Sequence, residues 1–263
     1  MVGGEQGRSD MGTPVYIQFV AEILNSGSAP FYALATDGQR YLCKSPNSPH
    51  DVEAVVNEVA VGLVGERLNA HVRPWRILRV PESLKGTLIE SESSVYSLDK
   101  PVFGSRFLPN ANLDYIEGEI PGIEKDDNVH HVPKIISLWL LCNPQKDIQI
   151  LLEEKNEDSI WSIDHGFWFD SLPTPWNLPE VNEPCGRPPI PRIRKAIPKQ
   201  CWNDALYGLT RLNAQLKDDL FEALPPEWEV SREKTDRLIS YVLKRKQYAR
   251  ETLEKLKEQT EGR

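Results

Sequence analysis

Short apolar runs separated by turn residues fill the first part of the chain, a pattern typical of antiparallel strands. The runs are rich in β-branched and aromatic residues, and the cluster NSGSAP and the pair Asp37 and Gly38 lie between the first of them. Strands are predicted over residues 15–24, 31–38, 41–46, 72–80 and 103–109. A polar insertion rich in Ser and Glu separates the last two. We therefore expect an antiparallel sheet in this half of the chain.

A single helix is predicted inside this sheet region. Pro46 and Pro49 interrupt the strand pattern, and Asp51 is a suitable N-cap for a helix over residues 52–68. Apolar residues recur there at close to helical spacing, which indicates that one face of the helix packs on the sheet.

The second half of the chain is predicted to be mainly helical. VPKIISLWLL, from about residue 129, has a helical apolar pattern, and IQILLEE and SIWSIDHG form a hairpin bridged by KNED. Residues 170–192 are rich in proline and are expected to be irregular. Two helical segments follow, separated by LPPEW. The order predicts an α+β fold with a flexible tail (1–13), an N-terminal sheet lobe (14–109) and a C-terminal helical lobe (110–263).

Composition and charge exclude several classes of protein. The longest apolar run, residues 135–142, is much shorter than the roughly 20 residues that span a bilayer. The first dozen residues resemble a loose tail and not a signal peptide. Four scattered cysteines suggest neither a zinc site nor disulfides, and the net charge of −8 argues against direct nucleic-acid binding. We expect a cytoplasmic protein without a membrane segment.

Three charged residues lie where phosphoryl transfer needs them. Lys44 falls in the third predicted strand and Glu58 in the helix that follows, where the carboxylate would pair with the lysine. Asp164 ends the apolar strand IWSI, so its carboxylate must be paired, bind a cation or lie at the strand's exit. Each residue alone is commonplace, but their order matches the arrangement in kinases.

The same residues carry a resemblance to a known family. The segment YLCKSPNSPHDVEAVVNEVAVGLVGERL resembles the lysine strand and Asn-Glu helix of HipA-like kinases, and VFGSRFLP resembles the segment that links their lobes. CNPQKDIQILL followed by IDHGFWF is similar to their catalytic loop and metal-binding Asp segment. The resemblance spans residues 15–180 approximately, and it implies a two-lobed kinase-like fold, bacterial Ser/Thr-kinase activity, ATP and Mg²⁺.

The resemblance also implies roles for individual residues. Lys44 would contact the nucleotide phosphates, Glu58 would orient Lys44, and Asp164 would bind the metal. The backbone of Phe103 to Phe107 would contact adenine, and the turn from Asn25 to Ala29 either lies over the phosphates or is a plain hairpin turn. The implied nucleotide-binding residues, besides Lys44, are Gly27, Ser28, Phe103, Gly104, Ser105 and Arg106.

The catalytic loop departs from the family pattern. Gln145 stands at the position of the catalytic Asp, and Ile150 at that of a metal-binding Asn. Glutamine cannot accept a proton at neutral pH, and isoleucine cannot bind a cation. Asp147 would replace the base and Gln149 would offer a carbonyl oxygen to the metal if the loop is shifted in register; otherwise both are solvated residues of a degenerate site.

Three functions remain open from the sequence. The first is an ATP-dependent kinase that acts on a protein Ser/Thr or a small-molecule hydroxyl, with reduced activity. The second is a pseudokinase that serves as a nucleotide-binding or interaction module in a toxin–antitoxin or defence system. The third is an unrelated α+β binding protein. The acceptor and any partner protein cannot be named from the sequence.

Overall fold

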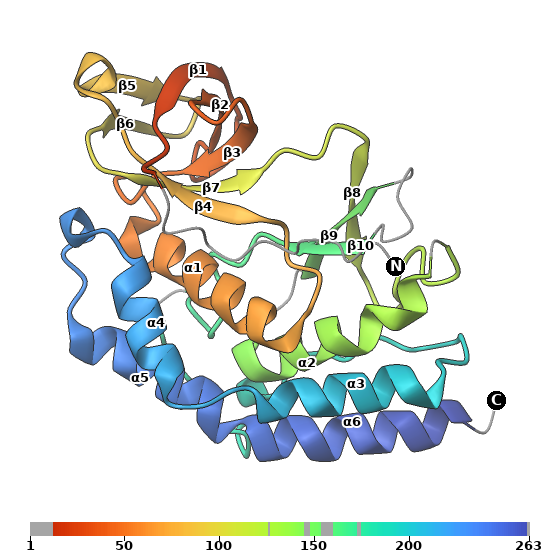
Figure 1. Cartoon of the computed structure of the whole chain (residues 1–263). Coiled ribbons are helices and arrows are strands. Elements are labelled where there is room, and N and C mark those ends of the chain that lie inside the picture. Colours follow the sequence, from red (N-terminus) through yellow and green to blue (C-terminus); the bar gives the residue numbers. More distant parts are fainter. Residues whose placement is uncertain (1–12, 126, 145–147, 154–159, 173–174, 262–263) are drawn as a thin grey trace. The chain divides into compact units, whose positions relative to one another are not determined.

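The computed structural model describes residues 13–261 except 126, 145–147, 154–159 and 173–174. These residues form two compact units. The first contains the described residues up to Val55 together with Pro74–Phe107 and Pro225–Glu229. The second contains Val56–Arg73 and the described parts of Leu108–Leu224 and of the chain from Val230 onward. Figure 1 shows the elements of both units along the chain.

A five-stranded antiparallel sheet forms the first unit, as the sequence predicts. Its order is β1-β2-β3-β7-β4, and every neighbouring pair is antiparallel. The strands are β1 (Ile17–Ile23), β2 (Phe31–Ala35), β3 (Arg40–Lys44), β7 (Val102–Arg106) and β4 (Trp75–Leu78). Alternate residues of these strands are buried, for example Phe31, Ala33 and Ala35 of β2, so one face of the sheet supports a core.

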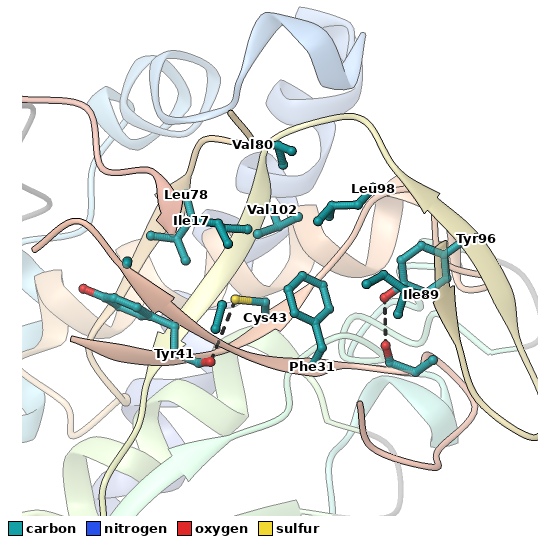
Figure 2. Packing of buried hydrophobic residues seen from close by; sticks show 13 residues of the cluster. Ile17, Phe31, Tyr41, Cys43, Leu78, Val80, Ile89, Tyr96, Leu98 and Val102 are labelled. Carbon is teal, nitrogen blue, oxygen red and sulfur yellow. Dashed lines mark hydrogen bonds between the residues drawn. The ribbon is translucent and has the colours of Figure 1, made fainter. Parts of the chain in front are cut away.

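The Ser- and Glu-rich insertion contains two strands that the sequence did not predict. It forms a separate hairpin, β5 (Thr87–Glu90) and β6 (Val95–Leu98), preceded by the short 3-10 helix η1 (Glu82–Leu84). Ile89, Tyr96 and Leu98 of this hairpin are buried in one cluster with core residues of the sheet (Figure 2). Leu88 and Val95 are apolar yet exposed, so the apolar residues do not mark one face, and the strand pattern is hidden in the sequence.

Helix α1 (Asp51–Leu68) confirms the predicted helix, although it begins at Asp51 itself. It is buried on all sides from Ala54 to Gly65, and not on one face alone. A helix that is apolar all round is expected to be buried in this way. Asn57 and Glu58, the polar pair in this stretch, are therefore enclosed by protein.

The second unit contains a three-stranded antiparallel sheet of order β10-β9-β8. Strands β9 (Ile148–Glu153) and β10 (Ile160–Ile163) form the predicted hairpin. The KNED bridge falls within 154–159 and lies outside the described residues. Strand β8 (Ala111–Ile116) was not predicted, since this edge strand leaves Leu113 and Tyr115 exposed and shows no inward alternation.

Helices make up most of the rest of the second unit. The sequence predicted two C-terminal helices, and each is interrupted: α3 and α4 are separated at residues 211–214, and α5 and α6 at Arg245. The helices are α2 (Val132–Cys142), α3 (Lys199–Thr210), α4 (Gln215–Ala223), α5 (Arg232–Lys244) and α6 (Lys246–Glu261), with short 3-10 helices η2 (Asn128–His130), η3 (Pro184–Gly186) and, in the first unit, η4 (Pro226–Trp228). None of the helices that the structure describes has the length and apolar character of a membrane span.

Candidate functional site

Asp164 and Gln149 lie in contact at the end of the β9–β10 hairpin. Nε2 of Gln149 donates a hydrogen bond of 2.6 Å to Oδ2 of Asp164. The register explains this contact, because Gln149 is the partner of Ile163, the residue before Asp164. Asp164 is half-buried and has a φ of 57°, so the chain turns away directly after the carboxylate. The structure thus brings together the two residues that the sequence assigned to a metal.

Helix α1 holds the residue after Asp164 through Glu58. The backbone N–H of His165 donates to Oε1 of Glu58 at 3.1 Å, and Nδ1 of His165 lies 3.0 Å from Oε2. Nε2 of the same ring lies 3.1 Å from Oγ of Ser162 in β10. All three residues are buried, so these contacts are structural. The predicted pairing of Glu58 with Lys44, which belongs to the other unit, stays a prediction.

Asn57 fixes the chain further along the same segment. Its Nδ2 donates to the carbonyl of Gly166 at 2.8 Å and to Oγ of Ser171 at 3.1 Å. Its Oδ1 accepts from Nε1 of Trp176 at 2.6 Å. Sequence reasoning missed this role, although a signal existed: an amide in the apolar run VVNEVAV must find partners when it is buried.

The catalytic-loop segment is described only at its ends. Asn143 ends α2 in the left-handed region with a φ of 51°, and its Nδ2 donates to the carbonyl of Cys185 at 3.0 Å. Gln145 and Asp147 lie outside the described residues, so the base assigned to Asp147 stays a prediction. Ile150 is fully buried in β9. Its side chain can take no part in metal binding.

One end of the sheet in the first unit contains three of the predicted site features. They are the turn at Asn25–Ala29, Lys44 and Phe103. Phe31, which follows the turn, pairs with Cys43, and Lys44 pairs with Phe103. Lys44 is half-buried at the end of β3. This places the lysine at the same sheet end as the proposed phosphate turn.

The backbone of the turn has a positive φ, 42°, at Ala29. A Cβ added at Gly27 would lie 3.0 Å from Nε2 of His50, so glycine is favoured there by the close approach of this ring. Gly27 is exposed and Ser28 half-buried.

Strand β7 contains Phe103, Gly104, Ser105 and Arg106, the residues predicted to meet adenine. It is an interior strand that pairs with β3 on one side and with β4 on the other. The N–H of Arg106, the last residue of β7, donates to the carbonyl of Pro74. The N–H of Phe107 donates to the carbonyl of Arg40. Arg106 lies opposite Tyr41, at the far end of the strand from Lys44. The adenine contact stays a prediction.

The donor set suits a nucleotide-bound cation better than a resident metal. Among the described residues, no three His, Cys, Asp or Glu side chains gather into a metal site. Mg²⁺ is typically bound by one or two carboxylates together with substrate phosphates and water. Asp164 offers a carboxylate, and Gln149 offers a carbonyl oxygen once its amide turns over. Both are hard oxygen ligands and fit Mg²⁺.

Comparison with known proteins places the chain by fold alone. No family model and no curated protein matches it. The Helicobacter pylori proinflammatory kinase CtkA is similar in structure, with a TM-score of 0.52 at 12% identity over 90% of this chain and 95% of that one. The Golgi casein kinase (TM-score 0.49, 14% identity, 91% and 74% covered) and hydra Fam20 with sugar (TM-score 0.49, 11% identity, 92% and 85% covered) also match. The chain has a kinase-like fold.

Proposed function

We propose that the protein is a HipA-like kinase that binds ATP with Mg²⁺ and transfers phosphate to a protein Ser/Thr or a small-molecule hydroxyl. The observation that carries this proposal is the contact between Asp164 and Gln149 at the end of β10. Asp164 directly precedes His165 and Gly166, which α1 fixes through Glu58 and Asn57. Such rigid placement is what phosphoryl transfer requires, since its catalysis is chiefly positioning and charge neutralisation.

Each residue of the site has a proposed part in binding or proton transfer. Lys44 contacts phosphate oxygens, and the backbone of the turn at Asn25–Ala29 lies over them. Asp164 and Gln149 hold Mg²⁺, which when bound neutralises charge on the phosphates. Asp147 accepts the proton of the acceptor hydroxyl. Glu58 would orient Lys44, as the resemblance implies.

The half-buried faces around Asp164 support nucleotide binding. Ile163 and Leu151, on the strands that carry Asp164 and Gln149, are half-buried, and Leu113 and Tyr115 of β8 lie beside Leu151 and Gln149 in register. An apolar surface next to a cation ligand suits a ligand with an aromatic base and a polyphosphate.

Replacing Asp164 tests the metal role. We expect Asp164→Ala to weaken binding of ATP in the presence of Mg²⁺ at least about tenfold, since a charged contact is lost. Binding of ATP in EDTA should be unchanged, because this binding does not use the carboxylate. Titration calorimetry measures both. Asp114→Ala is the matched control, because Asp114 is also half-buried and lies in the same sheet.

Equal Mg²⁺ dependence in the wild-type chain and Asp164→Ala would exclude Asp164 as a metal ligand. Reduced binding in Asp114→Ala as well would indicate a general loss of structure in this sheet. The two outcomes are separated by measuring thermal unfolding of each variant without ligand.

The burial of Ile150 favours a second candidate, a pseudokinase that binds nucleotide without transferring phosphate. Incubation with γ-labelled ATP and a panel of protein and small-molecule acceptors discriminates the two. Transfer to any acceptor, including the chain itself, that is lost in Lys44→Ala excludes the pseudokinase. Mg²⁺-dependent binding with no transfer favours it, and the chain is then an interaction module.

A further inference from the structure

The β5–β6 hairpin contacts the turn at Asn25–Ala29 through three hydroxyl groups. Oγ of Ser94 donates to the carbonyl of Gly27 at 2.9 Å, and the hydroxyl of Tyr96 donates to the carbonyl of Ala29 at 2.7 Å. Oγ of Ser93 adds a longer bond of 3.3 Å to the carbonyl of Ser26. Figure 2 shows Tyr96 beside Ile89, with its hydroxyl bond dashed. The hairpin thus donates hydrogen bonds to three carbonyl oxygens of the turn, those of Ser26, Gly27 and Ala29.

These bonds hold a strained backbone. Ala29 has a φ of 42° although it is not glycine, and it is completely buried. A left-handed conformation persists at such a residue only when its surroundings over-determine it. The N–H of Ala29 donates to Ser26 and its carbonyl accepts from Tyr96. Both ends of the strained residue are therefore fixed.

The donors of the hairpin are themselves well placed. Ser94 and Tyr96 are buried, and the N–H of Ser91 donates to the carbonyl of Ser94 at 2.8 Å, which closes the hairpin turn. Burial raises the pKa of Tyr96, so its phenol stays protonated and remains a donor. Ile89 and Leu98 anchor the same hairpin in the core.

The same turn also contains two N–H groups, those of Gly27 and Ser28, that could bind an anion. Within the part of the chain that the structure describes, the N–H groups of Gly27 and Ser28 donate to no protein acceptor. Gly27 is exposed. Successive backbone N–H groups in a turn form a concave site that attracts anions. Carbonyls bonded by the hairpin, together with two N–H groups that have no protein acceptor among the described residues, give the turn the polarity that a phosphate needs.

We propose that the β5–β6 hairpin is a brace that shapes this turn for nucleotide phosphates, with Ser94 and Tyr96 as positioning residues. The inference rests on the proposed nucleotide binding and adds to it the element that orders the phosphate turn. It favours the phosphate turn over a plain hairpin turn, the alternative that the sequence left open.

The test compares nucleotides with and without phosphate. In the double variant Ser94→Ala with Tyr96→Phe, we expect the Kd for ATP and ADP to rise about tenfold, because two neutral hydrogen bonds are lost. The Kd for adenosine should not change, since it lacks phosphate. Tyr41→Phe is the control: Tyr41 lies in the same core, and its hydroxyl bonds Asp37, between β2 and β3.

Amide hydrogen exchange without nucleotide tests the brace independently. The N–H of Ala29 should exchange faster in the double variant and not in Tyr41→Phe. Should the double variant not fold, Ser94→Ala alone is used in both assays. An unchanged exchange rate at Ala29, or an ATP-to-adenosine affinity ratio equal to that of the wild-type chain, would overturn the inference.

Failure of the proposed function has a different result. If the wild-type chain binds neither ATP nor ADP, nucleotide binding is wrong and the phosphate role of the turn falls with it. Faster exchange at Ala29 in the double variant would then leave the hairpin as a purely structural brace.

Discussion

Asn57 uses both ends of its side-chain amide, and this makes it the central residue of the second unit's polar core. Four groups from residues more than a hundred positions away bond it: the carbonyls of Gly166 and Trp168, the hydroxyl of Ser171 and the indole N–H of Trp176. An isolated buried amide would oppose folding, but a fully bonded one favours a single arrangement of its partners. The residue therefore couples α1 to the segment that follows Asp164.

Asn57→Ala should destabilise the protein by about 2–4 kcal/mol, since it leaves the carbonyl of Gly166 and the indole N–H of Trp176 buried without their bonds. Urea denaturation measures the change in unfolding free energy. Asn203→Ala is the control, because Asn203 is half-buried and accepts a hydrogen bond from Lys257; its cost should be below about 1 kcal/mol. Equal costs would show that the Asn57 network adds nothing specific.

The candidate site was only partly predictable from single residues. Asp164 was recognisable because a carboxylate in an apolar run must be paired, bind a cation or lie at the end of the strand. Gln149 was recognisable because it directly precedes Ile150, which replaces the metal-binding Asn of the family pattern. The contact of Glu58 with His165 was not, because 107 positions separate them. Neither spacing nor composition shows which distant residue a buried polar group meets.

At the scale of elements, the last turn of α2 receives a hydrogen bond from Arg245, the residue between α5 and α6. The carbonyl of Leu140 would normally accept from residue 144, but this is a proline and has no N–H. Nε of Arg245 donates to that carbonyl at 2.8 Å, and the N–H of Phe169 donates to Cys142 at 2.9 Å. The break between α5 and α6 thus places a buried arginine at the last turn of α2.

Arg245→Met should destabilise the protein by about 1–3 kcal/mol, because it leaves the buried carbonyl of Leu140 without a donor. Burial lowers the pKa of Arg245, but its guanidinium also bonds the hydroxyl of Tyr241 at 2.9 Å and lies over the ring of Tyr248. Thermal and urea unfolding measure the effect. Arg211→Met, at the exposed end of α3, should change stability by less than about 0.5 kcal/mol. A more stable Arg245→Met variant would mean that desolvating the cation outweighs its bonds.

Elements were predictable where apolar spacing is regular and hidden where it is not. The sheet strands and α1 follow from their patterns, whereas β8 and the β5–β6 hairpin do not, because their exposed residues are apolar and their buried ones few. The interruptions at residues 211–214 and at Arg245 carry no proline or glycine in the sequence. Tertiary contacts, such as that of Arg245 with α2, fix the second break.

At the scale of the whole molecule, the residues proposed to bind nucleotide are divided between the two units. The first contains Lys44 and the braced turn, and the second contains Asp164 with Gln149. A chain with a net charge of −8 needs local cations to hold a polyphosphate. Lys44 and Mg²⁺ would supply them, so nucleotide binding should depend on both.

Thermal unfolding of the full chain with ATP, with and without Mg²⁺, tests the central claim most directly. ATP at 100 times its Kd adds about 2.7 kcal/mol of stability, which for a domain of this size raises Tm by about 5–10 °C. We predict this rise with Mg²⁺ and a clearly smaller one in EDTA, with Asp164→Ala losing the difference. An unchanged Tm at millimolar ATP with Mg²⁺ would contradict the account, and the protein would then act through its kinase-like fold without a nucleotide.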